Sequence, residues 1–122
     1  MVLKPAQADT GIIFVRTDLG GVEIEAKAAN TAATGYATTL QRGGVSVQTV
    51  EHLLAALAGL SIDNAFVEID AGEIPIMDGS AKPFVRLIAD AGILALEKLQ
   101  PALKVIKPVF VREGNKQIAA WP

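Results

Sequence analysis

The hydrophobic pattern of the chain changes its period near Val50, and this change constrains the fold more than any other feature of the sequence. Before Val50, apolar residues alternate with polar ones or form short β-branched runs, as they do in strands. These runs lie at residues 12–16, 22–26, 36–40 and 45–47. Glycine pairs separate them two by two, because glycine readily takes the positive φ of a tight turn. This part of the chain therefore predicts two β-hairpins.

Beyond that point the apolar residues recur at helical spacing, which predicts two helices with a strand between them. The first helix is predicted over residues 50–60, with Thr49 as its N-cap and Gly59 as its C-terminal breaker. The run at residues 64–70 is typical of a strand.

The second helix follows a loop that ends in a capping residue, either Asp78 or Ser80. Pro83 falls in the first turn of this helix, where its missing N–H does no harm. Gly92 is predicted to end it.

A polar segment ended by Pro101 is the most linker-like part of the chain, and a strand pair is predicted after it, between Leu103 and Trp121. Two strands cannot bury a core alone. The pair therefore either joins the earlier sheet or begins a second domain. For the rest we expect an α+β fold, in which two helices lie on one face of a small, mainly antiparallel sheet.

The composition excludes several classes of function. The chain has 122 residues, of which 51% are hydrophobic, so one modest core is expected. Its 11 basic and 13 acidic residues form no basic cluster, which argues against a nucleic-acid partner or an anionic membrane surface. Cysteine is absent, which excludes disulfides and thiolate metal sites. No apolar run approaches the roughly 20 residues of a membrane span, and the first residues lack a secretory signal pattern, so we expect a cytoplasmic protein.

The single histidine, His52, follows Glu51 at the start of the first predicted helix. A structural interpretation is that His52 is partly buried and satisfied by one hydrogen bond, while Glu51 faces the positive end of the helix dipole. The catalytic alternative is that the neutral imidazole binds a metal and the adjacent carboxylate takes a proton from water. Zinc needs at least three protein ligands, and a chain with one histidine cannot close a histidine-rich zinc site by itself.

Four carboxylates downstream could in principle complete such a site: Asp63, Asp70, Glu73 and Asp78. Asp63 and Asp78 are each followed by residues typical of turns, so both are interpreted as structural. The chain also lacks a glycine-rich phosphate loop and the Gly-x-Ser-x-Gly pattern of a serine nucleophile.

Two long motifs carry a resemblance to a known family. Residues 49–93 read TVEHLLAALAGLSIDNAFVEIDAGEIPIMDGSAKPFVRLIADAGI and contain TVEHLxxALxGLxIDN and EIPIMDGSAxPF. They resemble the first domain of UDP-3-O-acyl-N-acetylglucosamine deacetylase, the zinc amidase of lipid A biosynthesis in Gram-negative bacteria. The earlier DTGIIFVRTDL is similar to the strand pair of that family, so the resemblance covers nearly the whole chain.

The resemblance implies two similar α+β domains packed face to face, with the helices sandwiched between the sheets. On that template, residues 1–100 are the first domain, which is half of the sandwich, and residues 101–122 are the linker and opening hairpin of a truncated second domain. The resemblance also implies that His52 is a zinc ligand and that Glu51 is the general base. The reaction implied is removal of the N-acetyl group from a small-molecule UDP-sugar, UDP-3-O-acyl-N-acetylglucosamine, in the committed step of lipid A biosynthesis.

The sequence departs from the family in the parts it lacks. The other two zinc ligands of the family, in a His-x-x-x-Asp motif, lie in the second domain, together with a catalytic lysine and a further histidine. These do not occur here, nor does the N-terminal Gly-x-His-Thr-Gly element. We therefore expect a fragment of the deacetylase that is inactive alone and binds zinc weakly or not at all.

An alternative from another class is a non-catalytic α+β interaction module that binds a partner through its helical face. With the second domain missing, that face would be uncovered and would favour self-association or poor solubility. The residues that mark the helix faces are Val50, Leu53, Leu57, Phe84, Leu87 and Ile88.

Overall fold

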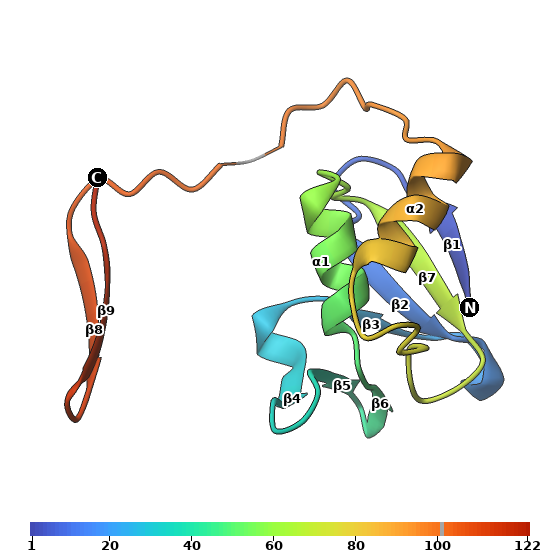
Figure 1. Cartoon of the computed structure of the whole chain (residues 1–122), viewed down its shortest axis with the longest axis horizontal. Helices are drawn as coiled ribbons and strands as arrows, with labels where there is room; N and C mark the ends of the chain where they lie inside the picture. The colour runs from blue at the N-terminus through green and yellow to red at the C-terminus, as the bar shows by residue number, and fades with distance from the viewer. Residues whose placement is uncertain (101) are drawn as a thin grey trace.

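The computed structural model describes residues 1–100 and 102–122, so Pro101, the end of the predicted linker, lies outside the described residues. Figure 1 shows two helices packed on a sheet and, apart from them, a C-terminal hairpin. None of the helices in the described part is long and apolar enough to cross a membrane.

The main sheet has four strands in the order β1-β7-β2-β3. They are β1 Val2–Pro5, β2 Ile12–Arg16, β3 Val22–Glu25 and β7 Ala65–Ile69. The pairs β1·β7 and β2·β3 are antiparallel, whereas β2 and β7 run parallel. The sheet is therefore mainly antiparallel, as predicted. The edge strand β1 was not predicted from the sequence, because four residues carry little pattern and their partner lies about 60 residues further along the chain.

Helices α1 Glu51–Gly59 and α2 Lys82–Ala91 lie on one face of this sheet, which confirms the predicted α+β architecture (Figure 1). Alternate residues of β7 point into the core beneath them, and Val67 is fully buried. Phe14 of β2 and Phe84 of α2 belong to the same core cluster, and both are almost completely buried. The helices therefore cover the apolar face of the sheet.

The predicted N-cap of the first helix is wrong. Helix α1 begins at Glu51, its cap position is Val50, and no side chain in the described part of the protein caps it. Thr49 has a φ of 59°, outside the extended region in which an N-cap residue normally lies. Its hydroxyl donates to Glu73 Oε1 at 2.6 Å instead of to the helix.

The start of α2 also differs in detail from the prediction, since the cap position is Ala81 and not Asp78 or Ser80. Asp78 Oδ1 accepts hydrogen bonds from the backbone N–H and the hydroxyl of Ser80, and Ser80 Oγ accepts from the N–H of Lys82. The pair therefore shapes the turn that precedes the helix. The predicted proline of the first turn and the predicted end at Gly92 are confirmed.

A second, three-stranded sheet lies beside the N-terminal end of α1. Its strands are β4 Thr31–Ala33, β5 Thr39–Arg42 and β6 Val45–Val47. The turn between β5 and β6 is the predicted glycine pair, with φ values of 56° at Gly43 and 82° at Gly44. Two short 3-10 helices, η1 Thr17–Leu19 and η2 Ala28–Asn30, complete this part of the chain.

The C-terminal strands β8 Val109–Glu113 and β9 Lys116–Ala120 pair with each other, which confirms the predicted hairpin. They form a two-stranded sheet of their own and do not join either earlier sheet. The rings of Phe110 and Trp121 meet edge to face with centroids 5.1 Å apart. That this hairpin begins a second domain stays a prediction.

Candidate functional site

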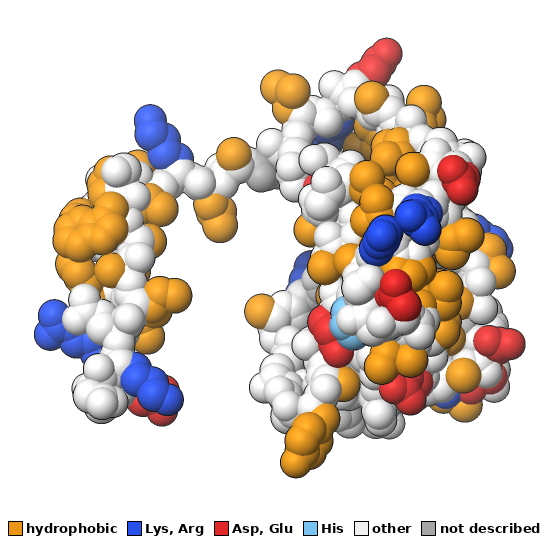
Figure 2. All heavy atoms as spheres, viewed as in Figure 1, with side chains coloured by type: hydrophobic (Ala, Val, Ile, Leu, Met, Phe, Trp, Pro, Cys, Tyr) orange, Lys and Arg blue, Asp and Glu red, His pale blue; other side chains and the backbone are white. Residues whose placement is uncertain are grey.

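Glu51 and His52 occupy the first turn of α1, and both side chains are half-buried. Successive helical residues leave the axis about 100 degrees apart, so the two side chains diverge from the same turn. In Figure 2 the one pale blue side chain, that of the single histidine, reaches the surface of the helical body among acidic side chains. The imidazole is therefore not enclosed by the core.

The Glu51 carboxylate is held by the backbone of the small sheet. Its Oε2 accepts a hydrogen bond from the N–H of Thr38 at 2.9 Å. The carbonyl of the same residue, Thr38, accepts from the N–H of Val50 at 3.3 Å. One peptide segment thus holds both the helix start and its first carboxylate. The bond uses Oε2 and leaves the other oxygen, Oε1, out of the contact.

The imidazole of His52 has unmet bonding capacity. Its Nδ1 is buried and has no hydrogen-bond partner in the part of the chain that the structure describes. Such an atom costs about 1–3 kcal/mol unless something else pairs with it. A histidine kept only for a single structural hydrogen bond through Nδ1 does not fit this finding. A partly exposed imidazole with an unpaired nitrogen fits one position of a metal site, in which the second ring nitrogen is normally bonded too.

The four downstream carboxylates are engaged elsewhere. Asp63 accepts from Gln100 Nε2 at 2.7 Å, and Asp70 Oδ1 lies 3.9 Å from the N-terminal amino group. Glu73 accepts from Thr49, and Asp78 accepts from Ser80, which lowers the pKa of the Asp78 carboxyl. Within residues 1–100 and 102–122, no three histidine, cysteine or acidic side chains are grouped so as to hold a metal ion. The described chain therefore offers one metal-ligand candidate, His52, and not a complete site.

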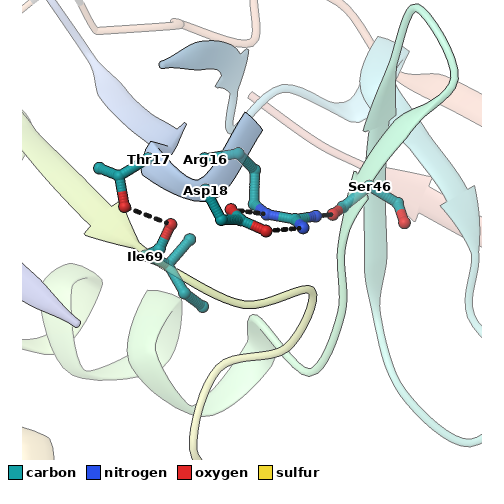
Figure 3. Close-up of polar contacts among 5 residues, drawn as sticks. All are labelled: Arg16, Thr17, Asp18, Ser46 and Ile69. Carbon is teal, nitrogen blue, oxygen red and sulfur yellow. Dashed lines mark hydrogen bonds and ion pairs between the residues drawn. The ribbon is translucent and has the colours of Figure 1, made fainter. Parts of the chain in front are cut away.

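Arg16, which was not singled out from the sequence, connects the four-stranded sheet to the three-stranded sheet. Arg16, 8% exposed at the end of β2, donates from Nε and Nη2 to Asp18 at 2.9 and 2.7 Å. Its Nη1 also donates to the carbonyl of Ser46 on β6 at 2.6 Å, and Figure 3 shows the guanidinium between these two partners. Beside it, the Thr17 hydroxyl donates to the carbonyl of Ile69.

The contacts of Arg16 and Thr49 could not be predicted from the sequence, because their partners are distant along the chain. Ser46 is 30 residues from Arg16, and Glu73 is 24 residues from Thr49. A carboxylate two residues after an arginine at a strand end was the one local signal for the Arg16–Asp18 pair.

Comparison with known proteins identifies the class to which this chain belongs. The family model described as LpxC: UDP-3-O-acyl N-acetylglycosamine deacetylase matches residues 1–122. The chain therefore belongs to the UDP-3-O-acyl N-acetylglycosamine deacetylase family.

Three curated relatives carry the name UDP-3-O-acyl-N-acetylglucosamine deacetylase. Those of Pseudomonas entomophila (strain L48) and Saccharophagus degradans are each 51% identical to this chain over 123 residues. That of Marinobacter nauticus is 54% identical over 123 residues. Each match covers 100% of this chain but only 40–41% of the relative. The chain thus spans about two-fifths of the length of the curated relatives it matches.

Proposed function

We propose that this chain supplies Glu51 and His52 to the active site of a zinc-dependent deacetylase that acts on UDP-3-O-acyl-N-acetylglucosamine in lipid A biosynthesis. One observation carries the proposal. The first turn of α1 presents a carboxylate held through a single oxygen next to an imidazole with an unpaired nitrogen, in a member of the deacetylase family. The partner is accordingly a small UDP-sugar.

Glu51 is the proposed general base. The hydrogen bond from the Thr38 N–H to Oε2 holds the carboxylate in one orientation, so that Oε1 can accept a proton from the attacking water. The water oxygen forms a bond to the acetamide carbon, and the C–N bond to the sugar breaks. The proton passes to the leaving nitrogen, and the products are acetate and the free 2-amine.

His52 is the proposed zinc ligand on this chain. Zinc, when bound, polarises the amide carbonyl and makes water easier to ionise. Because zinc takes at least three protein ligands, the others are proposed to come from the part of the relatives that this chain does not match.

The test is a chimaera in which this chain replaces the matching segment of the Marinobacter nauticus relative, which is 54% identical to it. We expect the chimaera to release acetate from UDP-3-O-acyl-N-acetylglucosamine. Glu51→Gln keeps an acceptor for the Thr38 N–H but loses the base, so kcat should fall by about 100-fold or more. Glu23→Gln, on the exposed face of β3, is the matched control and should leave kcat unchanged.

Zinc content provides a second readout that does not depend on turnover. His52→Gln should lower the zinc bound per chimaera, whereas Glu51→Gln should not. Full activity of the Glu51→Gln chimaera would show that the base is a different residue. Unchanged zinc content after His52→Gln would remove His52 from the ligand set.

A further inference from the structure

We propose that Thr49 and Glu73 are positioning residues for Glu51, because together they hold the strained turn from which the first turn of α1 starts. This inference rests on the proposed function, in which Glu51 is the base. Neither residue touches the reacting atoms in this proposal. They act through the backbone that leads into the helix.

Thr49 has an uncommon backbone conformation. Its φ of 59° lies in the left-handed region, which a β-branched residue rarely adopts. Strained residues of this kind persist where the surrounding structure holds them, and they cluster at functional sites. Thr49 lies two residues before Glu51 and is only 5% exposed. The strain is therefore located directly at the entrance to the catalytic turn.

Glu73 holds this strained residue. The Thr49 hydroxyl donates to Glu73 Oε1 at 2.6 Å, a short bond to a charged acceptor of the stronger kind. Two backbone hydrogen bonds lie beside it. The N–H of Gln48 donates to the carbonyl of Gly72 at 2.9 Å, and the N–H of Ile74 donates to the carbonyl of Gln48 at 3.0 Å. The segment before the helix is thus fastened to the loop that follows β7.

The start of the helix depends on this turn because no side chain in the described residues caps α1. Val50, which follows Thr49, is completely buried and donates its N–H to Thr38, and Glu51 accepts from the N–H of Thr38. Relaxation of Thr49 to an ordinary negative φ would rotate the following peptide. Both contacts with Thr38 would then be lost, and Glu51 would lose its fixed orientation.

Four variants separate positioning from a purely structural role. Thr49→Val keeps the branched shape but loses the donor, and Thr49→Ser keeps the donor. Thr49→Gly loses the donor but tolerates the positive φ without strain. Glu73→Gln keeps the size of the side chain but removes the charge. Thr49→Val and Glu73→Gln are also combined, because residues that act through one contact give non-additive effects.

Two readouts are measured. The first is the NMR shift and hydrogen-exchange protection of the Thr38 amide in the 122-residue chain, which reports the bond to Glu51. The second is kcat, KM and the melting temperature of the chimaera. We expect Thr49→Ser to resemble the unaltered protein. Thr49→Gly should melt at a higher temperature than Thr49→Val, yet both should lose protection at Thr38 and at least about tenfold in kcat. KM should change by less than about twofold, because substrate binding is not altered.

Three results would overturn the proposal. They are recovery of kcat together with stability in Thr49→Gly, an unchanged Thr38 amide in every variant, and full additivity of Thr49→Val with Glu73→Gln. If the unaltered chimaera shows no hydrolysis, the proposed function fails on its own. The Thr38 amide of the 122-residue chain then still decides whether Thr49 and Glu73 orient the Glu51 carboxylate.

Discussion

Arg16 is a nearly buried cation whose hydrogen-bonding capacity is used on both sides, by Asp18 and by the Ser46 carbonyl. The two hydrogen bonds from Arg16, helped by its charge, lower the pKa of the Asp18 carboxyl below its ordinary value of 3.8. The folded state therefore favours the ionised form of Asp18. The resulting stabilisation is fully present above about pH 4, and it is lost as the pH falls through the lowered pKa.

Asp18→Asn should consequently lower the free energy of unfolding at pH 7. The difference between the variant and the unaltered chain should begin to shrink as the pH falls below 3.8, because the unfolded chain then takes up the proton, and it should vanish only once the pH has passed the lowered pKa of the folded chain. Urea unfolding followed at pH 7, 5 and 3 measures this difference. A difference that stays constant over this pH range would show that the charge of Asp18 does not stabilise the fold.

The role of a residue can be predicted from the sequence when the residues that determine that role are close to it along the chain. Glu51 and His52 lie together in a motif, so the sequence alone singles them out. Thr49 has the side chain of a good N-cap, but a hydrogen bond to Glu73, 24 residues away, holds it in a conformation that a cap does not adopt. Local propensity therefore predicts which residue matters near Glu51, but not what it does.

The helices show how far hydrophobic periodicity predicts which apolar side chains are buried. Five of the six residues that mark the predicted helix faces are buried in the core, and Leu87 alone is exposed, at 58%. Leu87 and Met77, which is 48% exposed, line the same shallow hollow at the start of the helix. Periodicity finds the apolar face of a helix but does not show which of its edges the sheet covers.

Leu87→Glu should therefore reduce any self-association of the chain without disturbing its fold. Because the side chain is already exposed, the free energy of unfolding should change by no more than about 0.5 kcal/mol. Light scattering over a range of concentrations, together with urea unfolding, measures both quantities. Ile88→Glu is the contrasting variant, since that position is 7% exposed and a charge there should unfold the chain. An unaltered chain that stays monomeric at high concentration would contradict the expected self-association.

The protein consists of a packed body and a hairpin with very different support. The body has a continuous core of sheet and helix residues. In the hairpin, by contrast, every residue of β8 is exposed, and so is every residue of β9 except Ala119, which is partly buried. A two-stranded hairpin in water is marginally stable. The edge-to-face pair of Phe110 and Trp121 and a hydrogen bond from Arg112 Nε to Gln117 Oε1 add side-chain contacts to it.

Hydrogen exchange should separate these two parts of the chain. Amides of β2 and β7 should exchange slowly, at rates set by global unfolding, whereas those of β8 and β9 should exchange through local opening at much faster rates. NMR-detected exchange at pH 6 measures both sets in one experiment. Equal protection of Val67 and Val111 would show that the hairpin is stabilised by contacts with the body.

Beyond α2, the sequence predicted the β8–β9 hairpin correctly. It did not predict whether this hairpin joins another sheet. The hairpin is readable because alternation and a central glycine are local signals. Its placement is not readable from local signals, and in the structure β8 and β9 pair with each other and join neither the four-stranded nor the three-stranded sheet. The predicted domain boundary near residue 100 accordingly stays a prediction.

Thr38 meets Glu51 and Val50 through main-chain atoms, with its amide donating to one and its carbonyl accepting from the other. Every amino acid except proline brings the same two groups to that position. Mutation can therefore replace the threonine side chain while the hydrogen bond from the main-chain N–H of residue 38 to the Glu51 carboxylate is kept. Among chains of this kind, the identity of residue 38 is consequently a poor guide to whether the base is held, and a proline there is the one informative replacement.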